Sequence, residues 1–252
     1  MDFNLLSMFG IAFLALIAGA INTIAGAGSN LVVPALILFG LPAEIANATN
    51  RVGIIAQSSS ALAGFKHYGK FDTSDLGLIL IPIILGGLAG ASAIANINTQ
   101  HVKYVILGAM ILMACITYFK PQTVVPPEGT PIKKMRNTPL AWPVLFFVGF
   151  YGGLVQAGVG FLLIGAIAGN LRYDILKTNA LKHLCMLGFT FMSLAVFIWY
   201  DLINWLIGLV LSVGYIIGAQ IGVKLAVKAS PSSIKTFLFY MTIVACVAAL
   251  IS

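Results

Sequence analysis

Apolar residues fill most of the chain and gather in long runs that short polar stretches separate. Each run is close to the roughly 17 to 25 residues that a helix needs to cross a bilayer. The runs are Leu5–Ile24, Leu76–Ala95, Tyr104–Phe119, Leu140–Ala157, Leu184–Tyr200, Ile203–Val223 and Thr236–Ile251. No basic residue precedes the first run, so we expect it to stay as a span and not to be cleaved as a signal peptide. The pattern predicts an all-α polytopic membrane protein.

Composition supports the same class. Of the 252 residues, 60% are hydrophobic and 8% are charged, whereas a soluble domain carries roughly a quarter charged residues. The net charge of +7 would suggest nucleic acid as the partner of a soluble protein. Here the basic residues lie mostly between the apolar runs and act as topology determinants. We therefore expect a lipid bilayer around the protein and no nucleic acid as a partner.

A broken apolar segment occurs twice. The first copy is Ala18–Leu36 and the second is Tyr151–Gly169, with Gly26-Ala27-Gly28 matching Gly158-Val159-Gly160. Weaker matches follow in the same order, which indicates a duplication. A proline-rich stretch joins the two halves and is typical of a linker. We predict a first transmembrane repeat at 1–119, a linker at 120–138 and a second repeat at 139–252.

The basic residues indicate how the broken segments cross the membrane. A single crossing would divide the 14 lysines and arginines about evenly between the two sides. If the chain turns back at both glycine motifs, only Arg51 and Lys103 lie on one side and the remaining twelve lie on the other. We expect the protein in the cell inner (plasma) membrane, and this bias predicts that its linker lies on the cytoplasmic side. The halves then become inverted repeats, each with a broken or re-entrant first helix followed by three spans.

The first glycine motif leads into a short predicted helix. Ser29 and Asn30 are good N-cap residues for a helix from Leu31 to about Phe39. About ten residues reach roughly 15 Å, which is too short to span. A helix that begins inside the bilayer presents unpaired N–H groups and a partial positive charge, and both suit an anion. The alternative is that the glycines only allow close packing of helices.

Polar residues form a stripe on the next helix of each half. They are Asn47, Asn50, Arg51, Gln57 and Ser58 in the first half, and Thr178, Asn179, Lys182 and His183 in the second. Arg51 and Lys182 lie two to three turns into these helices, where a charge usually faces a cavity and has a partner. Nearly all seven carboxylates fall in predicted loops, so an anionic substrate would complete the pocket. Alternatively, both side chains extend to the lipid headgroups.

Three further polar residues have two readings each. Asn22 and Gln156 lie just before the two glycine turns, where they could contact a ligand or hold helices together. His183 could change its protonation during transport or make a structural hydrogen bond. Because only the first copy offers cap residues, we expect an unequal site to which the first half contributes more backbone groups.

No cofactor, metal site or catalytic centre is predicted. The three cysteines lie in apolar runs without CxxC or CxxH spacing. The chain has no HExxH motif, no pair of membrane aspartates and no serine in a nucleophile-elbow context. It also has no Walker A sequence. An intramembrane enzyme is therefore disfavoured, and a non-transporting scaffold or receptor would leave Arg51 and Lys182 without a purpose.

The glycine motif and its continuation resemble a known family. Ala18-Gly-x3-Thr-x2-Gly-x-Gly28, followed by Leu31-Val-Val-Pro34, Gly40-Leu-Pro42 and Ala48-Thr-Asn50, resembles the TauE/SafE family of sulfite exporters. The resemblance covers most of the chain. The second copy departs from it, because Gly165 stands where similar proteins commonly have a proline.

The resemblance implies a permease for sulfite, for sulfonates such as sulfoacetate, or for a related small anion. We expect a secondary transporter, with export as its direction, that works by alternating access about a midplane anion site. A permease for another small anion is the alternative, and a homodimer is left open. The candidate substrate-binding residues are Asn22, Gly26, Gly28, Ser29, Asn30, Thr49, Asn50, Arg51, Gln57, Gln156, Gly158, Gly160, Thr178, Asn179, Lys182 and His183.

Overall fold

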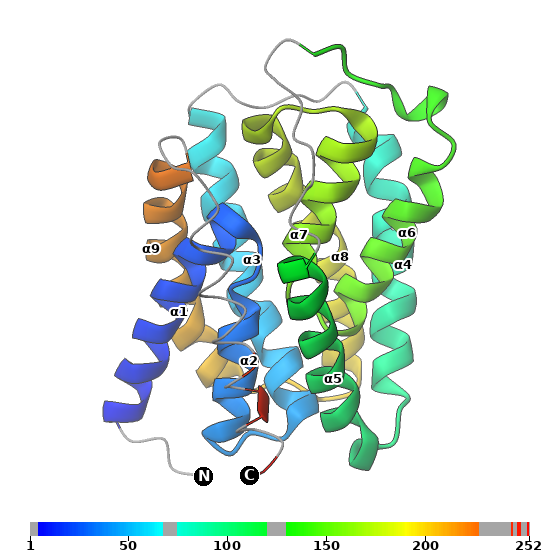
Figure 1. The fold of residues 1–252 in the computed structure, drawn as a ribbon. Coiled ribbons are helices and arrows are strands. Elements are labelled where there is room, and N and C mark those ends of the chain that lie inside the picture. Colours follow the sequence, from blue (N-terminus) through cyan, green and yellow to red (C-terminus); the bar gives the residue numbers. More distant parts are fainter. Residues whose placement is uncertain are drawn as a thin grey trace.

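The computed structural model describes residues 5–67, 75–119 and 130–226, together with the single positions 243, 246, 247 and 251. Within these residues every regular element is helical and no strand occurs. The helices stand side by side in one bundle (Figure 1). The all-α prediction is confirmed. Residues 120–129 of the predicted linker and most of the predicted last span lie outside the described residues.

The helices follow the predicted runs closely. In the first half they are α1 (Leu5–Ala25), α2 (Ser29–Leu38), α3 (Ala43–His67), α4 (Leu76–Ala95) and α5 (Thr99–Phe119). A 3-10 turn at Met135–Asn137 precedes the second half. There they are α6 (Ala141–Leu154), α7 (Val159–Ile164) with its π-helical continuation Gly165–Asn170, α8 (Ile175–Trp199) and α9 (Trp205–Ala226).

Five of these helices are long and apolar enough to cross a membrane. They are α1, α4, α8, α9 and the Thr99–Ile116 part of α5. Helix α3 is also long, with 25 residues, but its polar side chains keep it out of this group. It contacts α2, α5, α8 and α9, so neighbouring helices cover its polar residues. The chain is a multi-pass membrane protein whose most polar helix lies inside the bundle.

Both predicted breaks are present. The chain leaves α1 through Gly26, which has a φ of 80°, and leaves α6 through Gln156 and Gly158, with φ of 66° and 74°. Glycine adopts positive φ readily because it has no Cβ. A non-glycine residue rarely does so, and Gln156 is one of only three in the described residues, with Arg172 and Asp201. The second break is therefore the more strained of the two.

The start of α2 differs from the expectation in one respect. Its N-cap is Gly28, and Ser29 and Asn30 lie in the first turn, so the prediction that they cap the helix is wrong. The N–H groups of Asn30 and Leu31 already bond to carbonyl groups of the turn. The N–H of Gly28 donates to Oδ1 of Asn22 over 3.2 Å. Because α1 and the turn satisfy these donors, the helix needs no side-chain cap of its own.

The helices of the two halves interlock. Helix α1 packs on α9 and α6 packs on α4, and likewise α3 packs on α9 and α8 on α4. The bundle thus contains two helix groups, α1/α3/α9 and α4/α6/α8, which lie on the left and right of Figure 1 and meet where α3 contacts α8. Each group draws helices from both halves. A duplicated chain would give this reciprocal order, while the inverted relation of the halves and their boundaries stay predictions.

Glycines bring the helices of each group into backbone contact. A Cβ on Gly90 of α4 would lie 1.9 Å from the carbonyl oxygen of Phe150 in α6. One on Gly218 of α9 would lie 2.1 Å from the carbonyl oxygen of Leu16 in α1. Lipid tails are as apolar as leucine, so helices in a membrane associate through such close packing of small residues. Gly90 and Gly218, one in each half, therefore have the same structural role.

We predict that Gly90→Ala destabilises the bundle, because the added methyl group has no room against the α6 backbone. Overpacking of this kind typically costs about 1–3 kcal/mol. Gly77→Ala in the same helix is the matched control, since no atom lies within 4 Å of its Cβ position, and it should keep or raise stability. Unfolding of the purified protein in detergent would measure both changes. Equal stabilities of the two variants would contradict the close contact of α4 and α6.

Candidate functional site

The two breaks touch each other in the middle of the bundle. The N–H of Gly160 donates to the carbonyl oxygen of Gly26 over 3.0 Å. A Cβ on Gly26 would lie 2.4 Å from Cα of Gly160. Across the second break, the Cβ position of Gly158 lies 3.6 Å from Oδ1 of Asn30. The starts of α2 and α7 therefore lie next to each other, although they belong to different halves.

This junction brings together two helix starts with partial positive charge. Helix α2 has ten residues, so it is too short to cross the hydrophobic layer. Backbone that is not helical is tolerated within that layer only when protein or a cavity surrounds it. All four predicted glycines lie here, and a Cβ on Gly28 would lie 2.1 Å from the carbonyl oxygen of Ala18. The glycines thus serve both the turns and close packing.

Lys182 of α8 binds the end of α1. Its Nζ donates to the carbonyl oxygens of Asn22 (3.2 Å) and Thr23 (2.8 Å) and to Oδ1 of Asn179 (2.9 Å). The side chain is 0% exposed. The last carbonyl groups of a helix lack partners within the helix and carry a partial negative charge. The ammonium group of the second half therefore caps the broken helix of the first half.

Arg51 of α3 does the same for the end of α6. Its Nη2 donates to the carbonyl oxygen of Gly153 over 2.8 Å, and its Nη1 donates to that of Gly152. The guanidinium carbon lies 5.4 Å from the centre of the Phe197 ring, within the range of a cation–π contact. Asn47, one turn earlier, donates to the carbonyl oxygen of Leu154 over 3.0 Å. Together the two side chains of α3 cover the end of the broken helix of the second half.

These contacts decide between the two readings of the buried cations. Arg51 and Lys182 are fully buried against backbone of the other half, so neither extends to lipid headgroups. None of the four carboxylates in the described residues is buried; they are Glu44, Asp75, Asp174 and Asp201. In the described part of the chain, the helix ends take the place of the missing counter-ions. The formal charges of the buried side chains in this part therefore add up to a positive value.

Polar groups at the first break are almost fully paired. Asn22 donates to Oε1 of Gln57 over 2.7 Å and accepts the N–H of Gly28. Gln57 in turn donates to the carbonyl oxygen of Gly19 (3.1 Å) and to Oγ1 of Thr23 (3.3 Å). The side chains of α3 therefore fasten the end of α1. At Asn22 the reading as a helix-holding residue describes the contacts that the structure has.

Unpaired polar atoms lie around the touching breaks and at the end of α6. Gln156 donates to Oγ1 of Thr190 over 3.1 Å, but its Oε1 is buried without a partner. Oδ1 of Asn30, Oδ1 of Asn47 and Nε of Arg51 are likewise buried and unpaired within the described residues. Buried polar atoms are normally hydrogen-bonded, so these atoms mark a place that can receive a polar ligand. Three of these four residues, Asn30, Asn47 and Arg51, belong to the first half, while the expected larger backbone contribution of that half stays a prediction.

The remaining predicted residues hold helices together. Asn50 donates to Oγ of Ser29 over 3.0 Å and accepts the hydroxyl of Tyr215 over 2.8 Å, which joins α3 to α2 and α9. Thr49 accepts the N–H of Asn204 over 3.0 Å. The partners Tyr215 in α9 and Asn204 just before it, like Thr190 in α8, had no signal in the sequence beyond being polar residues near or in apolar runs.

His183 lies beside Lys182 but faces different partners. Its Nδ1 lies 3.5 Å from Oγ of Ser58, and its Nε2 is buried and unpaired in the described residues. The imidazole stacks on Phe65, with ring centres 6.0 Å apart. The ring thus links α8 to α3.

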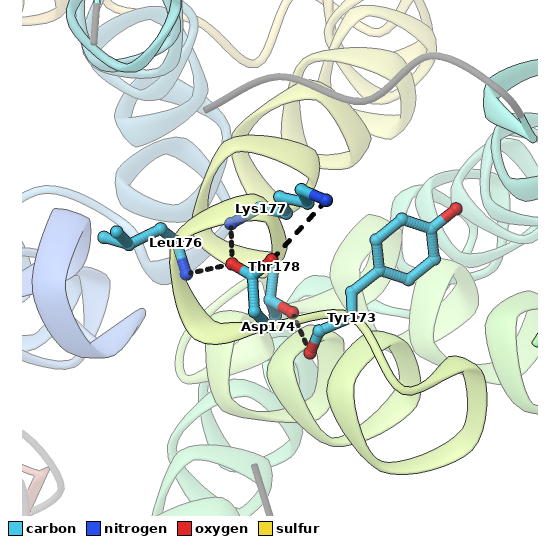
Figure 2. A network of polar contacts seen from close by, with 5 residues as sticks. All are labelled: Tyr173, Asp174, Leu176, Lys177 and Thr178. Carbon is cyan, nitrogen blue, oxygen red and sulfur yellow. Dashed lines mark hydrogen bonds and ion pairs between the residues drawn. The ribbon is translucent and has the colours of Figure 1, made fainter. Parts of the chain in front are cut away.

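The start of α8 is fixed by a side-chain cap (Figure 2). Asp174 is the N-cap, and its Oδ1 accepts the N–H groups of Leu176 (3.1 Å) and Lys177 (2.9 Å). The Lys177 ammonium group forms an ion pair with Asp174 over 3.7 Å. The hydroxyl of Thr178 donates to the carbonyl oxygen of Tyr173 over 3.2 Å. Thr178 therefore contributes to the helix start, and this start sets the position of Lys182 two turns further on.

Comparison with known proteins agrees with this architecture. The sequence profile of the family described as "Sulfite exporter TauE/SafE" matches residues 11–249. A "Probable membrane transporter protein" of Haemophilus influenzae is 28% identical over 230 residues, covering 90% of this chain and 88% of its own. "Probable membrane transporter protein ORF9" of Sinorhizobium sp. is 28% identical over 249 residues, with 96% and 90% covered. "Probable membrane transporter protein YfcA" of Escherichia coli K12 is 27% identical over 233 residues, with 92% and 85% covered.

We predict that Arg51→Met lowers the free energy of unfolding by about 2–4 kcal/mol, since two buried carbonyl groups lose their donors. The free energy of unfolding of Arg51→Lys should lie between those of Arg51→Met and the wild type. Lysine keeps the charge but lacks the two parallel donors of the guanidinium group. Arg136→Met is the matched control at an exposed arginine and should change stability by less than about 0.5 kcal/mol. Unfolding in detergent would test the three variants, and an Arg51→Met protein as stable as the wild type would contradict the capping role.

Proposed function

Because the chain belongs to the TauE/SafE family of sulfite exporters and is a membrane transporter, we propose that it is a secondary transporter that exports a small sulfur-containing anion. Sulfite, or a sulfonate of the sulfoacetate type, is the proposed substrate. In this proposal the chain catalyses no chemical reaction, and the anion binds where the two breaks meet.

The observation that carries the proposal is the sign of the buried charge. In the described residues, the buried side chains with a formal charge are Arg51 and Lys182, and no buried carboxylate accompanies them. An intramembrane charge is expensive and marks a substrate or ion pathway. The start of α2 adds the partial positive charge of a helix N-terminus. This environment favours an anion and disfavours a cation or a neutral solute.

The second break supplies the groups that would orient the anion. A sulfite or sulfonate group carries its charge on three oxygen atoms, which need hydrogen-bond donors. The Thr190 hydroxyl can donate or accept, so Gln156 can exchange its amide oxygen and nitrogen and present an NH₂ group instead. Asn30 lies across from it, with Oδ1 and Nδ2 at 3.6 and 3.8 Å from the Cβ position of Gly158. The unpaired atom of Asn30 is Oδ1, so its amide too would have to turn before it could donate. The free Nε of Arg51 is a further donor. These donors support a site for an oxyanion at the break.

Alternating access would use the two helix groups. Lys182 joins α8 of one group to α1 of the other, and Arg51 joins α3 to α6 in the opposite sense. Rocking of α1/α3/α9 against α4/α6/α8 would open the junction first to one side of the membrane and then to the other. The breaks lie between the groups, so the bound anion would stay near the midplane while the groups move.

The membrane orientation is also proposed from charge. The ends of α3 and α9, which carry Lys66 and Lys224, and the start of α6 after the linker lie at the top in Figure 1. Positively charged segments remain in the cytoplasm. We therefore place this end, with the linker 120–138, on the cytoplasmic side of the inner membrane.

We predict that the protein in liposomes carries sulfite or sulfoacetate, and that Asn30→Leu and Gln156→Leu lower this flux about tenfold or more. Both residues have a buried oxygen without a partner. Gln156→Leu also removes one hydrogen bond to Thr190, which is typically worth about 1 kcal/mol, so both variants should still fold. Asn96→Leu, at an exposed position, is the control with unchanged flux. Absence of flux for every sulfur anion in the wild type would refute the function, and full flux in both variants would refute the site.

We predict that a cysteine at Lys133 reacts with a membrane-impermeant maleimide only from the cytoplasmic side. A cysteine at Asp201, in the exposed turn between α8 and α9, should react only from the opposite side. The native Cys185 and Cys246 are buried and should add little background once Cys115 is replaced by serine. Inverted and right-side-out vesicles would separate the two cases. Labelling of both positions from the same side would contradict the proposed topology.

A further inference from the structure

The ammonium group of Lys182 sits in a complete set of oxygen atoms. Two are backbone carbonyl oxygens at the end of α1, those of Asn22 and Thr23, and the third is Oδ1 of Asn179. The distances to Nζ are 3.2, 2.8 and 2.9 Å, and no part of the side chain is exposed. An ammonium group has three N–H donors, one for each oxygen. A neutral amine would turn its lone pair towards one of the three, so the geometry fits the charged form.

The same oxygen atoms resemble the ligands of a bound alkali cation. In transporters with broken helices, unwound carbonyl groups and the C-terminal ends of half-helices coordinate the coupling Na⁺. Here the end of α1 offers two such carbonyl groups, and Asn179 adds an amide oxygen. The position that a coupling cation would take is occupied by the nitrogen of the chain's own side chain.

The end of the other broken helix is occupied in the same way. The carbonyl oxygens of Gly152 and Gly153 are bound by the Arg51 guanidinium, and that of Leu154 is bound by Asn47. A guanidinium group is always charged in a protein. The ends of α1 and α6, where the two breaks begin, therefore each already bind a cationic side chain of the protein.

We propose that the oxygens of Asn22, Thr23 and Asn179 form a monovalent-cation site that Lys182 fills as a tethered cation, so that anion transport needs no co-bound Na⁺. The cation site follows from the geometry around Nζ alone. The independence of transport from Na⁺ rests on the proposed function, because it concerns how that transport is coupled.

The site is tested by removing the tether and supplying a free cation. In Lys182→Ala the three oxygens lose their cation and a space of the size of a lysine side chain opens. Methylammonium chloride should then raise the midpoint of thermal unfolding of Lys182→Ala by about 3 °C or more at tenfold excess over its dissociation constant, whereas N-methylglucamine chloride should not. The wild type and Lys177→Ala, the control on the same helix, should not respond. A Lys182→Ala protein that folds but gains nothing from methylammonium, ammonium or Na⁺ would overturn the cation site.

The coupling is tested on the wild type, which does not depend on how the variant folds. Sulfite flux into liposomes should stay within about twofold when all Na⁺ and K⁺ are replaced by N-methylglucamine. A flux that requires Na⁺ would overturn the proposal. Complete absence of sulfur-anion flux would instead refute the proposed function, while stabilisation of Lys182→Ala by methylammonium would still be measured by unfolding alone. The two failures are therefore distinguishable.

Discussion

The structure depends on one constraint, which is that carbonyl groups at the end of a broken helix cannot be left unpaired inside a bilayer. Water is absent there, so each such group needs a partner from the protein. Arg51 supplies such a partner to Gly153 and Lys182 supplies one to Thr23, and each side chain reaches from one half to the broken helix of the other. The carbonyl oxygen of Asn22, which Lys182 also binds, accepts the N–H of Gly26 as well. A cation at a helix end is favourable also because of the helix dipole. The breaks and the buried charges therefore stabilise each other, and neither would be acceptable alone.

This exchange has consequences for the whole bundle. Each group of three helices contains members of both halves, and the glycine contacts between α4 and α6 and between α1 and α9 make the groups close-packed. Between the groups the described contacts are the α3–α8 crossing, the touching breaks, the two cations and the hydrogen bond from Asn47 to Leu154. Two close-packed helix groups that meet along one helix crossing and a set of polar contacts are a suitable basis for movement between two arrangements. The proposed anion site lies in this joint.

The two breaks differ in the strain of their backbone and in the pairing of their polar groups. The first break is closed by Asn22 and Gln57, whose donors and acceptors are paired. The second has a non-glycine residue at positive φ and several unpaired atoms. Strained backbone and unsatisfied polar groups often collect where a protein binds or moves. The two breaks therefore differ in strain, although each has a residue with an unpaired amide oxygen, Asn30 at the first and Gln156 at the second.

The sequence by itself determined the membrane class, the positions of both breaks and the helix that carries Arg51, because apolar length, glycine spacing and polar stripes are local patterns. It did not determine what the cations bind, since their partners at Gly153 and Thr23 are backbone atoms of the other half, more than a hundred positions away. Asn50 and Tyr215, and likewise Thr49 and Asn204, are also hydrogen-bond partners from different halves that lie more than a hundred positions apart. Backbone carbonyl groups have no sequence signature, so only the tertiary packing of the two halves could assign them as counter-charges.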